Sequence, residues 1–273
     1  MHEMLIDVLQ LLGYQFFQHA LLGGIIAAVA CTGIGLFLIL RKEAMIADGI
    51  SHTAFGGIAL GLLLGVYPLI TALIVSILAV LGISYLKKKG LAQSDSAIAV
   101  MLALGFSTGL IIISLVKGFN VELFSYLFGS ILTINQVDLL TVFLLGFTTI
   151  LFLGLFYKEL LAITFDEQSA KLTGIPTGAF TLGFNLLVAT TIVLSIKIIG
   201  IILVVALIVL PGLTALQLRR SFRQTMFASF GFGGMSVFLG IFLSAWFDVA
   251  ASGVIVILAV GFFIIVALYR RLR

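Results

Sequence analysis

The 273-residue chain is 62% hydrophobic and only 10% charged, whereas a soluble globular domain is about 25% charged. Its formal net charge of +4 does not indicate a nucleic-acid partner, because the basic residues stand in short clusters between long apolar stretches. The composition therefore excludes a soluble domain and predicts an all-α, polytopic integral membrane protein.

The N-terminal segment, residues 1–16, has apolar side chains at helical spacing and carries the acidic residues Glu3 and Asp7. It lacks the basic start and the small-residue cleavage site of a signal peptide, so we expect a helix lying at the membrane surface. The single cysteine, Cys31, lies in the following apolar stretch, and one chain can therefore form neither a disulfide nor a cysteine-based zinc site.

About nine apolar segments are each long enough to cross ~30 Å of hydrocarbon as a helix. They are predicted at residues 17–40, 46–65, 67–86, 96–116, 136–157, 177–195, 198–218, 224–246 and 251–269. Basic clusters separate them at residues 41–42, 87–89, 158–171, 219–223 and 270–273. The positive-inside rule places these clusters in the cytoplasm, with the N-terminus outside the cell membrane and the C-terminus inside.

The second crossing carries the strongest functional signal of the chain. Its residues Asp48 and His52 stand one helical turn apart, so one helix face presents both a carboxylate and an imidazole. An Asp inside a membrane helix costs about 2.5–3.5 kcal/mol and usually faces the protein interior or water. Because these donors suit zinc and manganese, we expect a divalent metal ion there. The alternative is an Asp48–His52 hydrogen bond that only fixes helix packing.

Residues 118–135 do not fit a membrane crossing, because only about 14 of them have helical character. Counting them as a crossing would also place the later basic clusters outside. We predict a re-entrant half-helix that enters from outside and borders a pathway. Its Glu122 is a third candidate oxygen ligand or an outer relay; the alternative is an interfacial carboxylate at a helix N-terminus.

The longest polar interval, residues 158–176, has its own helix signals. Thr164 or Asp166 can cap a short helix, and Gly174 with Pro176 can end it. We interpret this segment as a docking element for a soluble partner. The alternative is a surface loop with a single helical turn.

Three further features fall in the second half of the chain. Lys197 and Asp248 are placed at the outer surface, where a gate role competes with interfacial anchoring. Pro211 and Gly212 should kink a crossing near its cytoplasmic end, as a hinge or as a bend fixed by packing. No phosphate-binding loop and no nucleophile–base pair occurs, so we predict neither ATPase nor other enzyme activity.

Several short motifs occur in the order found in a known family. They are Asp48-Gly49-Ile50-Ser51-His52 followed by glycines, Tyr126-Leu127-Phe128-Gly129, Lys197 with Gly200, and Pro211 followed by Thr214-Ala215. With these motifs the chain resembles, over almost its whole length, the permease subunits of zinc and manganese ABC importers. It departs from them at Phe55-Gly56-Gly57 and at Ala250, where family members often have proline.

The resemblance implies a single permease domain with the cobalamin-permease-like fold. It implies a homodimer, two separate ATP-binding subunits and an extracytoplasmic metal-binding protein. It also implies metal contact by Asp48, His52 and Glu122. The polar segment from Phe165 to Gly174 resembles the coupling helix of that family. Its coupling residues would be Phe165, Asp166, Glu167, Ala170 and Gly174.

We therefore expect a permease subunit that imports a divalent metal without any permanently bound cofactor, while a partner subunit uses the ATP. Residues 121–129 resemble the zinc branch more than the manganese branch, although imidazole and carboxylates bind both ions. A proton-coupled transporter or channel would instead use Asp48, His52 and Glu122 as a relay. A siderophore or cobalamin permease would not depend on Asp48 or His52.

Overall fold

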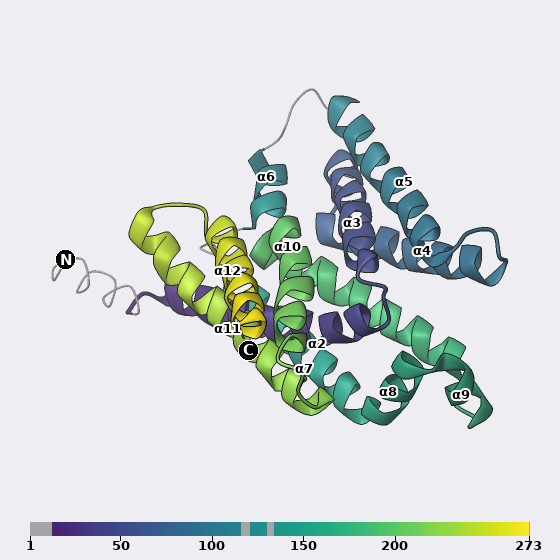
Figure 1. Cartoon of the computed structure of the whole chain (residues 1–273). Coiled ribbons are helices and arrows are strands. Elements are labelled where there is room, and N and C mark those ends of the chain that lie inside the picture. Colours follow the sequence, from purple (N-terminus) through teal and green to yellow (C-terminus); the bar gives the residue numbers. More distant parts are fainter. Residues whose placement is uncertain (1–12, 116–120, 130–133, 273) are drawn as a thin grey trace. The chain divides into compact units, whose positions relative to one another are not determined.

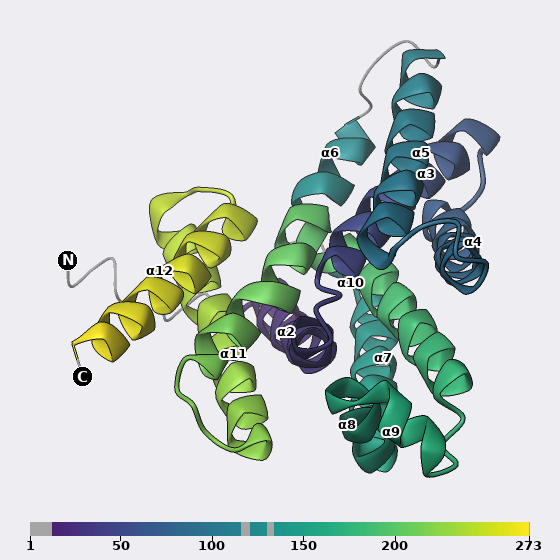
Figure 2. The same ribbon diagram turned by 45° about the vertical axis from the view of Figure 1, so that its right-hand side comes forward.

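The structure is a computed structural model that describes residues 13–115, 121–129 and 134–272. Every regular element in this part of the chain is an α-helix, as Figures 1 and 2 show. The helices are α2 (Gln15–Leu40), α3 (Met45–Leu64), α4 (Pro68–Lys88), α5 (Ser94–Leu115), α6 (Val121–Phe128), α7 (Gln136–Leu155), α8 (Tyr157–Phe165), α9 (Glu167–Leu172), α10 (Thr177–Leu216), α11 (Phe222–Phe247) and α12 (Ala251–Arg271). The predicted all-α class is confirmed. Most of the predicted surface helix, residues 1–12, lies outside the described residues.

Within the described ranges, eight helices are long and apolar enough to cross a membrane, namely α2, α3, α4, α5, α7, α10, α11 and α12. The element α10 has 40 residues, about twice the length that a crossing needs. It is two helices joined at Gly200, whose φ of 80° and ψ of 160° are not helical. The two crossings predicted over 177–195 and 198–218 therefore meet at Gly200, and Lys197 lies inside a helix, not between two helices.

The helices form two compact units. One contains the chain up to Leu36, Ser125–Thr148 and Ser195–Arg273. The other contains Phe37–Phe124 and Thr149–Leu194. Helices α2, α6, α7 and α10 contribute residues to both units.

In the second unit, small residues let α3 pack closely against α4 and α5. A Cβ atom on Gly57 would lie 2.6 Å from Ala72 Cα, and one on Gly105 would lie 2.5 Å from Thr53 Cα. As a result, 72% of the most apolar stretch of α3 is buried, against 33% in α4 and 28% in α5. The central position predicted for this helix from its glycines is confirmed.

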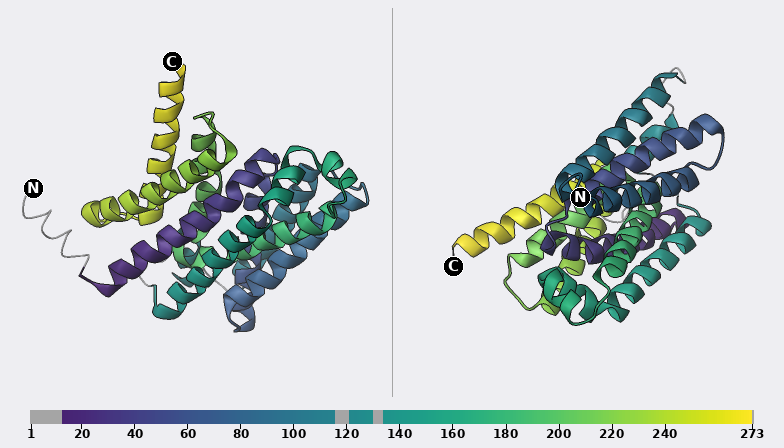
Figure 3. Two further views of the ribbon diagram at one scale, coloured as in Figure 1. Left: turned by 90° about the horizontal axis from the view of Figure 1, so that it is seen from below. Right: turned by 90° about the vertical axis from the view of Figure 1, so that its right-hand side faces the viewer.

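In the first unit, α2 packs against α10 and α11 by the same means, and α11 lies beside α12 (Figure 3). A Cβ atom on Gly233 of α11 would lie 2.6 Å from Thr32 Oγ1 of α2. The Thr32 hydroxyl donates to the Leu207 carbonyl of α10 at 3.3 Å. Small residues thus replace bulky side chains at the helix contacts of both units.

The short helix α6 ends against the break in α10. Its eight residues span about 12 Å, too short for a crossing, as predicted for a half-helix. Gly129 follows α6 with φ 79°, and a Cβ atom there would lie 2.5 Å from the Ile199 carbonyl carbon. A Cβ atom on Gly200 would in turn overlap the Gly129 nitrogen. Residues 118–120 and 130–133 of the predicted half-helix lie outside the described residues.

Candidate metal site

The predicted ligands Asp48 and His52 occupy the first two turns of α3. Asp48 lies in the first turn, where the positive end of the helix dipole favours a carboxylate. Its Oδ1 atom is 3.4 Å from His52 Nε2, so the predicted i,i+4 approach is confirmed. The two side chains are 35% and 33% exposed, which leaves both reachable for an ion.

Aromatic packing holds the His52 ring in place. The ring lies edge-on to Phe106 of α5, with 5.1 Å between centroids, and Phe106 in turn lies 5.7 Å from Phe55. In the part of the chain that the structure describes, the Asp48 carboxylate has no charged or hydrogen-bonding partner except His52. The two side chains are therefore held in a fixed orientation, and the carboxylate oxygens of Asp48 keep lone pairs that can bind an ion.

Asp48 and His52 do not complete a metal site by themselves. Among the described residues, no group of three or more His, Cys, Asp or Glu side chains is placed to hold a metal ion. Glu122 lies in the first turn of α6, but its side chain is outside the description. Its role as third ligand stays a prediction.

The predicted polar segment forms two short helices, α8 and α9, with Asp166 between them. Asp166 caps α9: its Oδ1 accepts from the Gln168 and Ser169 backbone N–H groups at 3.0 and 3.1 Å. The hydroxyl and backbone N–H of Ser169 hold the pKa of Asp166 below its ordinary value. The alternative cap, Thr164, is wrong, because its hydroxyl bonds back to the Leu160 carbonyl. Gly174, with φ 89°, follows the end of α9 as predicted.

This segment combines exposed apolar side chains with a buried anchor. Phe165 is 69% exposed and Leu172 is 89% exposed, whereas Ala170 is only 3% exposed. Glu167 is also exposed. Phe165 and Leu172 are therefore available for a partner, and the docking role of this segment stays a prediction.

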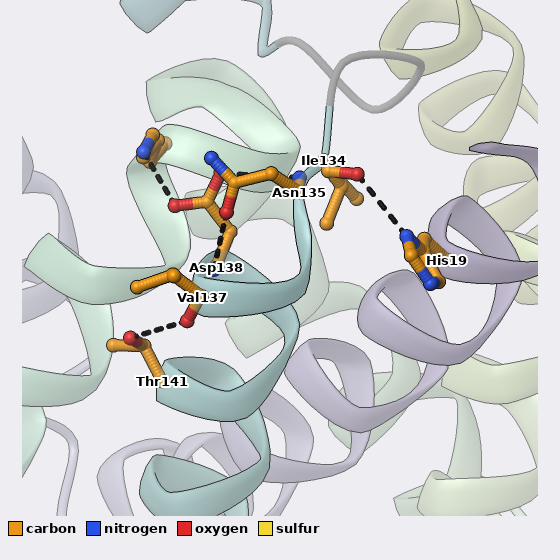
Figure 4. Close-up of polar contacts among 7 residues, drawn as sticks. His19, Ile134, Asn135, Val137, Asp138 and Thr141 are labelled. Carbon is orange, nitrogen blue, oxygen red and sulfur yellow. Dashed lines mark hydrogen bonds and ion pairs between the residues drawn. The ribbon is translucent and has the colours of Figure 1, made fainter. Parts of the chain in front are cut away.

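Lys197, predicted at the outer surface, has a side chain that is 31% exposed; its gate role stays a prediction. It forms an ion pair with Asp138 of α7, whose side chain is 10% exposed. Asn135 Oδ1 accepts the Asp138 backbone N–H at 2.9 Å, and Asp138 Oδ2 accepts the Asn135 backbone N–H (Figure 4). This is a capping box at the start of α7. Sequence reasoning missed Asp138; its only signal is an Asn three residues before it, ahead of an apolar run.

The remaining gate and hinge candidates are Pro211, Gly212 and Asp248, and their roles stay predictions. Pro211 lies inside α10, whose break in helical angles is at Gly200, between the two predicted crossings. The kink at Pro211 and Gly212 stays a prediction. Asp248 ends α11 with a left-handed φ of 51° and is exposed. The break in α10 is at Gly200, which the sequence indicated only as part of a motif.

Comparisons with known proteins assign the chain to a class. The family model described as ABC 3 transport family matches residues 13–270. The chain is 34% identical over 250 residues to the manganese transport system membrane protein MntC of Halalkalibacterium halodurans, covering 92% of this chain and 86% of that protein. It is 31% identical over 252 residues to the manganese import system permease protein ScaB of Streptococcus gordonii, covering 92% and 90%.

The fold also matches a solved structure, PsaBC from Streptococcus pneumoniae in complex with Fab. The TM-score is 0.86 with 32% identity, over 96% of this chain and 95% of that chain. The predicted class is confirmed: this is a multi-pass permease subunit of a metal ABC transporter and not itself an ATPase. The two relatives are named for manganese, so they do not support the preference for zinc drawn from residues 121–129. The chain belongs to the ABC 3 transport family.

Proposed function

We propose that this permease of an ATP-driven divalent metal importer carries manganese, and that the ion passes Asp48 and His52. The observation that carries the proposal is the pair itself: a carboxylate and an imidazole 3.4 Å apart, each about one-third exposed, on a helix whose most apolar stretch is 72% buried. The names of the relatives supply the choice of manganese.

The ligand chemistry fits transient binding. One pair offers two donor groups, whereas manganese prefers about six oxygen and nitrogen ligands. A homodimer would bring two such pairs to one pathway, and Glu122 and water would supply further oxygens. An incomplete set of protein ligands lets the ion leave again, which a closed structural site would prevent.

The coupling to ATP is assigned to α8 and α9. Two separate ATP-binding subunits would push on the exposed Phe165 and Leu172, and the Asp166 cap would keep α9 rigid under that load. Gly174 and Pro176 connect α9 to the start of α10. An extracytoplasmic metal-binding protein would deliver the ion on the opposite side, where the positive-inside rule places the N-terminus.

Zinc is the second candidate, because a site of mixed nitrogen and oxygen ligands binds zinc more tightly than manganese. If zinc is the cargo, uptake should follow zinc even when manganese is in excess. If manganese is the cargo, the metal-binding protein must select it before the permease receives it.

Reconstitution tests the function. The full-length permease is placed in liposomes with its ATPase subunit and metal-binding protein, and uptake of radioactive manganese and zinc is measured with and without ATP. We expect manganese uptake that requires ATP and both partners. Uptake driven by a proton gradient without ATP would reject the importer in favour of a secondary transporter.

A further inference from the structure

A pocket of about 730 Å³ opens in the second unit, away from Asp48 and His52. Its walls are the turn between α2 and α3, the end of α4, helix α9 and the first turns of α10. All its lining residues belong to the same unit. The basic clusters beside it place this pocket at the cytoplasmic boundary of the membrane.

The lining has an excess of positive charge. Glu43 neutralises part of it, because its carboxylate lies 2.8 Å from Lys87 Nζ and 3.2 Å from Arg41 Nε. Lys88 and Lys171 also line the pocket, and neither has an ion pair within the described ranges. Glu167 is the one other acid in the lining.

The first turn of α10 adds to this positive potential. Thr177, Gly178 and Ala179 line the pocket, and the first turn of α10 contains no acidic residue. The N-terminus of a long helix carries partial positive charge, which suits an anion. The Thr177 and Ala179 N–H groups already donate to the Ile175 and Pro176 carbonyls, so the helix end contributes mainly through its dipole. A Cβ atom on Gly178 would meet nothing within 4 Å, so the space above this turn is open.

Asn185 supplies an independent sign of a ligand. It lines the pocket and is only 5% exposed, yet its Oδ1 atom has no hydrogen-bond partner among the described residues. A buried amide without a partner is costly, and such groups are usually satisfied by protein, water or ligand. A rotation of the Asn185 amide by about 180° exchanges its oxygen and its NH₂ group. In the rotated orientation the NH₂ group can donate a hydrogen bond to an anion.

We propose that this pocket binds a phosphate group, either of an anionic phospholipid headgroup or of a soluble phosphate compound. Lys88, Lys171 and the α10 N-terminus supply the charge, and Asn185 supplies a buried hydrogen bond. Basic pockets between membrane helices on the cytoplasmic side bind anionic headgroups by this chemistry. The site is separate from the metal path, so its test does not depend on which ion is carried.

The experiment measures binding to the full-length permease in neutral detergent, with dihexanoyl phosphatidylglycerol, glycerol phosphate and inorganic phosphate as probes. The double variant Lys88→Gln/Lys171→Gln should weaken binding roughly ten- to thirtyfold. The control Lys89→Gln/Lys158→Gln removes the same charge outside the pocket and should change it less than about threefold. Tighter binding of the lipid than of glycerol phosphate identifies a headgroup as the source, and equal binding identifies a soluble compound.

A second variant fills the pocket without changing its charge. Gly178→Val places a side chain in the open space, whereas Gly154→Val adds the same side chain at an equally open position on α7. Only Gly178→Val should abolish binding. Equal weakening by both lysine pairs, or unchanged binding to a folded Gly178→Val protein, would overturn the proposal. If Gly178→Val does not elute as a folded protein, the lysine pairs alone decide.

Discussion

Two acid–base pairs in this permease differ in every respect that decides their use. Asp48 and His52 lie on one helix, 3.4 Å apart, and each is about one-third exposed. Asp138 and Lys197 join two helices across 59 residues of sequence, with the Asp138 side chain only 10% exposed. Asn135 also bonds Asp138, whereas Asp48 has a single described partner. The first pair can accept an ion; the second is already satisfied.

The two pairs should therefore respond differently to the loss of a charge. An exposed pair contributes about 0–1 kcal/mol to stability, so its removal changes function with little effect on folding. Removing one partner of a buried pair leaves the other charge uncompensated and is strongly destabilising.

The largest expected effect is on transport by the first pair. If the proposal is right, Asp48→Asn and His52→Gln should each lower ATP-dependent manganese uptake about 100-fold or more, because each would remove one of the few proposed protein ligands. The thermal unfolding midpoint should stay within a few degrees. Asp95→Asn, an exposed carboxylate in the first turn of α5, is the matched control and should transport normally. Normal uptake by both ligand variants would reject the metal assignment.

The backbone beside the second pair gives the next largest effect. Gly200→Ala should lower the free energy of unfolding by about 3 kcal/mol or more, since the new Cβ atom meets the Gly129 backbone at a left-handed φ. Thermal or denaturant unfolding in detergent measures it. Gly231→Ala, in open space on α11, should be neutral or slightly stabilising. A fully stable Gly200→Ala protein would show that α6 does not pack against this break.

The second pair itself should show coupling. Asp138→Asn should destabilise the protein by about 2–3 kcal/mol, a value reduced because Lys197 is 31% exposed. Lys197→Met in the same chain should recover part of that loss, because the unpaired charge is then gone. A double-mutant cycle on unfolding measures the coupling, with Asp248→Asn as an exposed control. Strictly additive effects would place Asp138 and Lys197 with the weak surface pairs.

The contrast between the pairs also explains what the sequence predicted. Asp48 and His52, like the Asp166 cap, lie within one helical turn of their partners, so helical periodicity alone brings them together. Asp138 and Lys197 meet only through tertiary packing, and no local pattern joins residues so far apart. The Gly129–Gly200 contact was missed for the same reason. The sequence could not decide between zinc and manganese, because a carboxylate and an imidazole bind both ions.

The smallest expected effect is that of Asp166, which caps α9 without being buried. Asp166 caps α9, whereas Asp138 belongs to the capping box of α7 with Asn135. Asp166 is exposed, so only its hydrogen bonds to Gln168 and Ser169 contribute. Because its pKa is lower in the folded state, this contribution is present above the ordinary Asp pKa and is lost as the pH falls through the lowered value.

Amide hydrogen exchange of α9 measures this contribution directly. Asp166→Ala should reduce the protection of the Gln168 and Ser169 N–H groups at neutral pH while the global unfolding midpoint stays unchanged, since a lost exposed cap frays only the helix that it begins. Glu167→Gln, the neighbouring exposed acid that makes no such bonds, should leave both amides protected. A global loss of stability in Asp166→Ala would contradict this prediction, because it would mean that α9 supports the whole unit. Asp166 and Asp138 would then differ only in that Asp138 is buried.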